Sequence, residues 1–387
     1  MSNLTIDEYI SITRFSKGAP KRSEMISTVY SLVTKYADKS FVVPRLFVCN
    51  STDRVCETTD IKGISSVIID DYLFETFTDL NRIMTDNKSD HSTEVDLLIA
   101  KLSMEYLYID KGIYDPITVL HYAHALDEFR RSSGSRRIET IQTDLFVQMF
   151  FVIFHELMHA ILKQKNLQEY IDVKRRHFLD DYSNLDLPSL NQDDAIRLIL
   201  PIEYQECQNI DEFLRGVNIS ELSDLVIKTY SDHERFVTTI LKTKDDVIEE
   251  CICDQFAALM TVELFVNSLK MEPAYIILLI HLTILYLEVL WLTRELLVNQ
   301  RGPVYIAEKQ IRKDIFRLEM PALIQARIKT KRNFLKKCDS MLVEQHKKYT
   351  HLIKDKFLFG AVERREWITQ HGKTDSSGEF DRMIRGL

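Results

Sequence analysis

The segment His155-Glu156-Leu157-Met158-His159 combines residue types and a spacing that could perform hydrolysis. Residues four apart lie on the same face of a helix, so both imidazoles can reach one metal ion. Glu156, next to the first histidine, can then contact a water molecule held by that ion. Zinc bound in this way activates water, and peptide bonds are the first substrate to expect.

A long apolar run without Gly or Pro surrounds this motif. The run predicts a mostly buried helix from Thr143 to Gln164, about 33 Å long, with Thr143 as its N-cap. Two histidines and a glutamate inside a buried helix need polar partners, because unpaired buried polar groups are costly. A metal ion would satisfy all of them; the alternative is that both histidines form hydrogen bonds within the core.

A catalytic zinc site needs a third protein ligand and an open fourth position. Downstream, Glu250 and Asp254 are four residues apart in an apolar stretch and therefore share one helical face. We expect Glu250 to complete a His155–His159–Glu250 site. Asp254 would then accept the free ring N–H of a ligand histidine and fix its tautomer.

Other acids and a histidine between the two motifs are rival third ligands, and we prefer Glu250 to all of them. The rivals are Asp180, Asp181, Glu203, Glu206 and His233.

The pair of motifs, with Phe256 and Ala257 after the second, resembles the gluzincin class of metallopeptidases. The resemblance implies that His155, His159 and Glu250 bind zinc and that Glu156 is the general base. Residues 50–77 also resemble the strand-then-helix entry of such proteases. The nearest analogies are prenyl-protein and heat-shock membrane proteases, and peptidases of mobile elements and phage-exclusion systems.

Two features depart from that pattern. A long insert, residues 165–248, separates the ligand helices, and Cys253 occupies a position that is often alanine in this class. We interpret Cys253 as a small apolar filler rather than a fourth ligand.

Composition favours a mainly α protein with a small β-sheet, an α+β fold. The chain has 10 Gly and 8 Pro, where typical usage would give about 27 and 19. We expect a zincin-like catalytic core over residues 1–300, containing the insert, and a basic helical region over residues 301–387. Strands are expected at Phe41–Val48 and Ser65–Asp70, and loops at Asp86–Ser92 and Arg130–Ser135.

The six cysteines form no Cys-x-x-Cys pair, and the N-terminal residues lack the layout of a secretory signal. We therefore expect free thiols and a cytoplasmic protein.

Charge is unevenly distributed along the chain. Residues 301–387 hold 20 Lys and Arg against 11 Asp and Glu, a net charge of +9. Because the whole chain has a net charge of −8, residues 1–300 carry a net charge of −17. Either the basic helices meet the acidic body, or they dock an acidic protein partner. Nucleic-acid binding is not expected, because no recognisable motif interleaves aromatic and basic residues.

The segment Ala274–Thr293 is long and apolar enough to cross a bilayer, although it contains His281 and Glu288. We regard it as the only such segment and favour a buried core helix over a membrane span.

The expected function is zinc-dependent hydrolysis of peptide bonds in an intracellular protein, with Tyr305, His281 and His233 as candidate oxyanion donors. One alternative is a catalytically silent zincin scaffold that binds or regulates a partner. Another is a membrane-associated protease.

Overall fold

The computed structural model describes residues 20–35, 41–85, 92–132, 138–165, 167–183, 237–298, 303–328, 330, 333–375 and 377–385. By contacts the chain divides into two compact units. The first unit comprises Met1–Leu167 and Cys251–Leu387, and the second is Gln168–Glu250. The basic region after residue 300 therefore belongs to the same unit as the N-terminal half.

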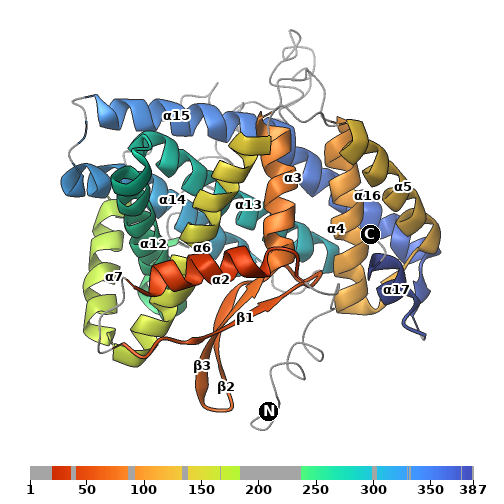
Figure 1. Ribbon diagram of the computed structural model, residues 1–387, viewed down its shortest axis with the longest axis horizontal. Coiled ribbons are helices and arrows are strands. Elements are labelled where there is room, and N and C mark those ends of the chain that lie inside the picture. Colours follow the sequence, from red (N-terminus) through yellow and green to blue (C-terminus); the bar gives the residue numbers. More distant parts are fainter. Residues whose placement is uncertain are drawn as a thin grey trace, which may run out of the picture. The chain divides into compact units, whose positions relative to one another are not determined.

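The first unit is a helical bundle with a small sheet at one side (Figure 1). The predicted fold class, mainly α with a small β-sheet, is confirmed. Its helices are α2 (Ser23–Thr34), α3 (Asp71–Thr85), α4 (Ser92–Lys111), α5 (Pro116–Ser132), α6 (Ile138–Lys165), α13 (Pro273–Val298), α14 (Pro303–Arg327), α15 (Phe334–Tyr349), the π-helix η2 (Thr350–Lys354), α16 (Asp355–His371) and α17 (Glu379–Arg385). The first unit also contains α12 (Asp245–Leu269) from Cys251 onward.

The main sheet has three strands in the order β1 (Arg45–Cys49), β3 (Ile64–Asp70), β2 (Glu57–Ile61). Strand β1 is parallel to β3, and β2 is antiparallel to it. Both predicted strands are present, although β1 begins four residues after Phe41. The sequence analysis missed β2.

Lys62 and Gly63 form the turn between β2 and β3, and both have positive φ, 54° and 77°. Two-residue hairpins need this backbone conformation because it matches the twist of the strands. The Lys-Gly pair that follows the polar Glu57–Asp60 segment was therefore the available signal for this hairpin. The second sheet pairs β4 (Ile113–Tyr114) with β5 (Lys373–Thr374).

Helix α6 carries the His-Glu-x-x-His motif through the centre of the first unit. It contacts α2, α3 and α13 and the strands β2 and β3, and nearly all of its apolar residues are buried. The helix begins at Ile138, so the prediction of Thr143 as its N-cap was wrong. The apolar run starts later than the helix because the first turns of α6 are more polar.

Helix α13 is the long apolar segment around Ala274–Thr293, and the first unit encloses it. Helices α4, α6, α14, α15 and α16 all contact it. Among the described residues, three helices are long and apolar enough to cross a membrane, so the view that this segment is the only one was wrong. The three helices differ in how much of an apolar 18-residue stretch is buried inside the protein. The buried share is 83% in α6, 50% in α12 and 89% in α13.

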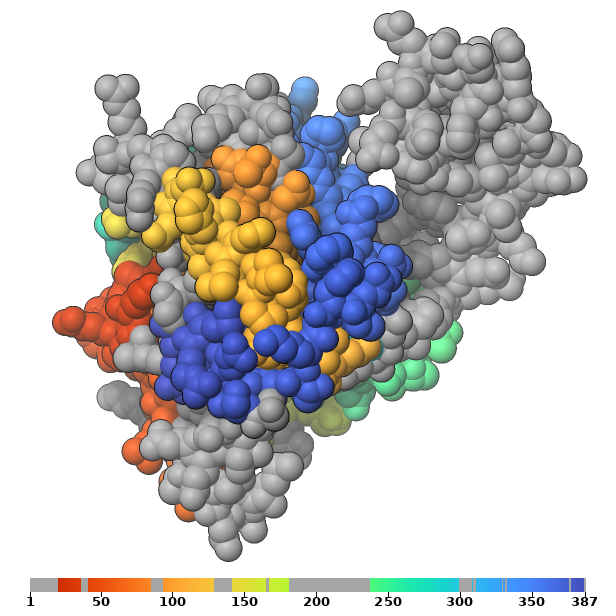
Figure 2. Space-filling model, turned by 90° about the vertical axis from the view of Figure 1, so that its right-hand side faces the viewer, coloured from red at the N-terminus to blue at the C-terminus, as the bar shows by residue number. Residues whose placement is uncertain are grey.

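The C-terminal helices pack back onto the N-terminal half. Helix α16 lies against α4 and α13, and α17 lies against α5. Figure 2 shows the same arrangement on one face, where the blue C-terminal segments lie beside the orange and yellow segments of α4 and α5.

Basic residues of the C-terminal helices pair with acids of α12, of α13 and of the short connection between these two helices. These pairs are Arg312–Asp254, Lys313–Glu288, Lys354–Glu288, Arg327–Glu263 and Lys337–Glu272. The charge asymmetry of the sequence is thus partly neutralised inside the fold.

In the second unit, α7 (Gln168–Ser183), a helical segment at residues 237–243 and the first turns of α12 are described. Arg175 ties these pieces together, since its guanidinium donates to the carbonyl of Leu241 at 2.8 Å and pairs with Asp245.

The predicted loop at Asp86–Ser92 lies almost entirely outside the described residues. The second predicted loop, Arg130–Ser135, was wrong in its first part, because α5 continues to Ser132. Residues 133–137 lie outside the described part of the chain.

Candidate metal centre

His155 and His159 lie one turn apart on α6, and their Nε2 atoms face each other at 3.2 Å. The carboxylate of Glu250, which lies on α12, is close to these two imidazole rings. One ligand atom from each of these three residues lies within 4.8 Å of the others. Among the residues that the structure describes, this is the only such group of three or more His, Cys, Asp or Glu.

The spacing of the two histidines fits two ligands of one tetrahedral metal ion. Two nitrogen ligands about 2.05 Å from a tetrahedral zinc ion would lie about 3.3 Å apart. The observed 3.2 Å between the two Nε2 atoms therefore already suits two ligands of one ion. His155 is 8% exposed, while His159 and Glu250 are half-buried, so a ligand could reach the group from the side of the latter two.

Helix α12 supplies Glu250 at the point where the chain passes from the second unit to the first. The helix runs unbroken from Asp245 to Leu269, and its course from Cys251 onward belongs to the first unit. Glu250 stands one helical turn before Asp254, which contacts α6 directly. The group is therefore a product of the pairing of α6 and α12.

Asp254 contacts Nδ1 of His155, the ring nitrogen that does not face His159. Its Oδ1 lies 2.9 Å from Nδ1 of His155. A carboxylate in this position holds the ring proton on Nδ1 and leaves the lone pair of Nε2 free for a metal. Burial alone would raise the pKa of Asp254, but the charge of Arg312 and the contact with His155 outweigh it and hold the pKa below its usual value.

Arg312 of α14 also binds Asp254, a contact that the sequence analysis missed. Its Nε donates to Oδ2 at 2.9 Å and its Nη2 donates to Oδ1 at 2.8 Å. The two residues are 58 positions apart in the chain. The only hint in the sequence is general: a buried carboxylate needs a cationic partner.

Glu156 lies on α6, where it contacts the edge strand β2. The hydroxyl of Thr58 is 2.6 Å from the backbone oxygen of Glu156 and 3.1 Å from its Oε2. The side chain of Glu156 is 6% exposed. Glu156 thus carries a largely buried carboxylate one residue from His155, and this carboxylate contacts the hydroxyl of Thr58.

Cys253 is fully buried on α12, and it does not belong to the three-residue group. Its position agrees with the interpretation as an apolar filler.

Of the candidate oxyanion donors, His281 is excluded by its position. Its ring is fully buried, 6.2 Å from the Phe316 ring and 6.1 Å from that of His346. No substrate can touch it there. His233 and the side chain of Tyr305 lie outside the described residues. Of the rival third ligands only the side chain of Asp180 is described; it is exposed and is not part of the group.

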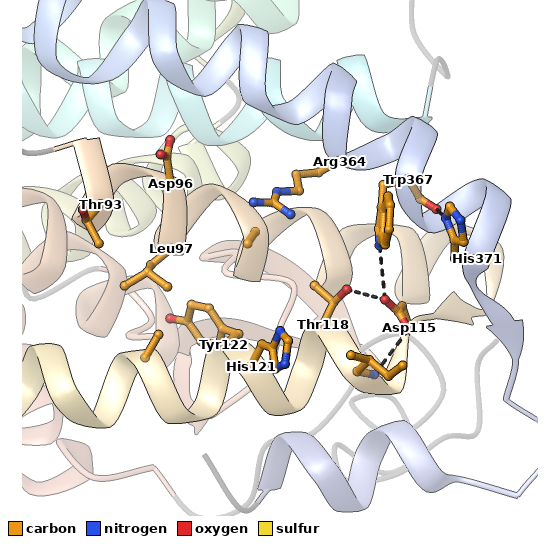
Figure 3. Close-up of a pocket in the computed structure, with 13 residues that line it drawn as sticks. Thr93, Asp96, Leu97, Asp115, Thr118, His121, Tyr122, Arg364, Trp367 and His371 are labelled. Atoms are coloured by element: carbon orange, nitrogen blue, oxygen red, sulfur yellow. Dashed lines mark hydrogen bonds between the residues drawn. The ribbon is translucent and has the colours of Figure 1, made fainter.

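A separate groove of about 670 Å³ lies between α4, α5 and α16 (Figure 3). At one end Asp115 accepts hydrogen bonds from the Thr118 hydroxyl, the Trp367 indole at 3.3 Å and the Ile117 backbone at 3.3 Å. The indole of Trp367 stacks on His371, with ring centroids 4.0 Å apart. Asp115 thus caps α5 and ties it to α16.

Comparisons of this chain with family models, with curated proteins and with solved structures find no match. The arguments for a function are therefore those of the residues and their geometry.

Proposed function

We propose that this chain is a zinc-dependent peptidase whose metal is held by His155, His159 and Glu250. The observation that supports the proposal best is the facing pair of Nε2 atoms, 3.2 Å apart, with Glu250 beside them. Two imidazoles and one carboxylate are a ligand set that catalytic zinc sites use, with a fourth position left for water.

When bound, zinc would polarise a carbonyl group and lower the pKa of a water molecule. The protein's own residues have three tasks in this mechanism. Asp254 holds the proton on Nδ1 of His155. Glu156 accepts a proton from water at its carboxylate and passes it to the leaving amine. Thr58 keeps the carboxylate of Glu156 in place through its hydroxyl.

Retention of Glu156 favours an enzyme over a silent binding scaffold, because binding alone needs no base. The substrate class, a peptide bond in an intracellular protein, follows from the resemblance of the two motifs to gluzincins and belongs to the same proposal.

We place the protein in the cytoplasm. The burial of α6 and α13 inside the first unit supports this location, since 83% and 89% of their apolar 18-residue stretches are covered by protein. The alternative is a membrane-associated protease with α12 toward the lipid. Extraction of the full chain in a detergent-free buffer would support the cytoplasmic location, and partition into the membrane fraction would overturn it.

The basic C-terminal helices remain a proposed contact surface for an acidic protein. Their pairs with acids of α12, of α13 and of the connection between these helices use part of their charge. Lys336 and Lys347 of α15 stay exposed. A nucleic-acid partner is not part of the proposal.

The test combines metal analysis with a cleavage assay on a library of peptides, read by mass spectrometry. The wild-type chain should carry about one zinc per molecule and cleave peptides. Glu250→Ala should lose the metal, whereas Glu249→Ala, the neighbouring substitution on α12, should keep it. Glu156→Gln should keep the metal and lose cleavage.

Each other outcome has a definite meaning. Absence of zinc from the wild type would overturn the proposal as a whole. Zinc without cleavage in the wild type would favour the silent scaffold. Full cleavage by Glu156→Gln would remove Glu156 from the mechanism.

A further inference from the structure

The guanidinium of Arg312 is a buried cation that binds Asp254, the carboxylate beside His155. Its side chain is 5% exposed, and its Cζ lies 5.3 Å from the centre of the Trp291 ring. Both of its hydrogen bonds to Asp254 are shorter than 3 Å. A guanidinium that binds a carboxylate with two parallel bonds fixes the plane of that carboxylate as well as its position.

One oxygen of Asp254 faces both Arg312 and His155. Oδ1 is 2.8 Å from Nη2 of Arg312 and 2.9 Å from Nδ1 of His155. Because the same atom is shared, the orientation of the His155 ring depends on where Arg312 holds the carboxylate. Arg312 lies on α14, far along the chain from the His-Glu-x-x-His motif.

We propose that Arg312 is a positioning residue of the metal site, which acts through Asp254 to hold Nε2 of His155 toward the ion. The proposal rests on the proposed metal site but not on peptidase activity. In this role Arg312 acts through Asp254, so its effect should appear in metal affinity.

Removal of the guanidinium would leave a buried carboxylate without its cation. Asp254 would then be free to rotate or to take up a proton, and Nδ1 of His155 would lose its fixed acceptor. Loss of such an outer partner typically lowers metal affinity by about 10- to 100-fold. Lysine offers a charge but cannot make the two parallel bonds, so Arg312→Lys should give an intermediate loss.

The experiment uses the full chain, stripped of metal, in five forms: wild type, Arg312→Met, Arg312→Lys, Asp254→Asn and Arg317→Met. Arg317 is the matched control, because it lies five residues further along α14, is 44% exposed and approaches Asp339 only at 3.9 Å. Zinc affinity is measured by competition with a chromophoric chelator. The visible spectrum of the Co²⁺-loaded forms reports the geometry of the site, and thermal unfolding of the metal-free forms reports folding.

We expect Arg312→Met and Asp254→Asn to weaken zinc binding by about 10- to 100-fold and to change the Co²⁺ spectrum. Arg317→Met should match the wild type. If Arg312→Met fails to fold, Arg312→Lys decides: a loss of affinity in a folded Arg312→Lys supports the proposal, and wild-type affinity overturns it.

The two possible failures differ. A wild type that binds no zinc overturns the metal site itself. A wild type that binds zinc, with Arg312→Met binding equally well and giving the same Co²⁺ spectrum, overturns only the role of Arg312.

Discussion

The hydroxyl of Thr58 lies 2.6 Å from the backbone oxygen of Glu156, 98 positions further along the chain. The same hydroxyl is 3.1 Å from Oε2 of the Glu156 side chain. The edge strand β2 thus contacts both the backbone and the carboxylate of the proposed base.

Thr58→Val should lower the free energy of unfolding by about 1 kcal/mol, because one partly buried hydrogen bond is lost. It should also slow peptide cleavage while zinc affinity stays the same, since Thr58 contacts Glu156 and no metal ligand. Thr58→Ser keeps the hydroxyl and is the control. Equal cleavage rates for the valine and serine variants would argue against a role of Thr58 in placing the base.

Arg54 and Glu105 form an ion pair with both side chains almost completely buried, and the Tyr72 hydroxyl also donates to Glu105 at 2.8 Å. Arg54→Met should lower the free energy of unfolding by about 3 kcal/mol, because it leaves a buried carboxylate without its guanidinium. This is the lower end of the usual range, since Lys101, a buried cation 4.6 Å from the centre of the Tyr72 ring, also attracts the Glu105 carboxylate.

Urea denaturation measures this effect. The double variant Arg54→Met with Glu105→Gln should be more stable than the single Arg54→Met variant, because the unpaired charge is gone and Tyr72 keeps an acceptor. A double variant that is less stable than Arg54→Met would contradict this explanation.

His281, buried on α13, makes the stability of the fold sensitive to acid. Burial, helped by the charges of Lys313 and Arg317 and by His346, lowers its pKa from 6.5 to about 3. Between these two values the unfolded chain binds one more proton than the folded chain. The free energy of unfolding should therefore fall by up to about 1.4 kcal/mol per unit as the pH drops below 6.5.

His281→Leu should remove this contribution and make the pH dependence of unfolding shallower. It should also raise stability near neutral pH, because neither ring nitrogen of His281 has a hydrogen-bond partner among the described residues. Denaturation curves at several pH values measure both effects. The same substitution at His124, whose side chain is 79% exposed, is the control; parallel curves for wild type and His281→Leu would disprove the prediction.

Asp115→Ala should lower the free energy of unfolding by about 1–2 kcal/mol, because α5 loses its cap and Trp367 loses an acceptor. Burial acts to raise the pKa of Asp115, but the hydrogen bonds from Thr118 and Trp367 outweigh it and hold the pKa below its usual value. The carboxylate is therefore the form that caps α5.

Tryptophan fluorescence reports the same change locally, since the chain has only two tryptophans. The Trp367 signal should shift in Asp115→Ala, whereas Asp96→Ala, at the far end of the groove in Figure 3, should leave it unchanged. An unaltered emission spectrum in Asp115→Ala would show that the indole contact is not maintained in solution.

The sequence was sufficient for the parts of the fold that depend on local pattern. The apolar run around His155 predicted a buried helix, and the β-branched run Ser65–Asp70 predicted the central strand. Strand β2 was missed because it is short and mostly polar, so its signal lay in the Lys62-Gly63 turn rather than in its own residues. The start of α6 was misplaced because its first turns are too polar to show the core-facing pattern.

The candidate site divides in the same way. Residues four apart on a helix can be paired from spacing alone, which is how Glu250 and Asp254 were selected. The contacts of Arg312 with Asp254 and of Thr58 with Glu156 depend on how separate elements pack. No periodicity within one segment encodes such contacts.

Gln164, near the end of α6, accepts a hydrogen bond from the backbone N–H of Val42 at 3.1 Å. Its side-chain amide also donates a hydrogen bond to the carbonyl of Val42 at 2.7 Å. Lys163 beside it donates to the carbonyl of Thr58 at 3.0 Å. Together with Thr58 and Glu156, these contacts fasten the helix to the polypeptide on either side of β1. The carboxylate of Glu156, the proposed base, is thus held in place before any ligand arrives, and little reorganisation energy would be spent in aligning it.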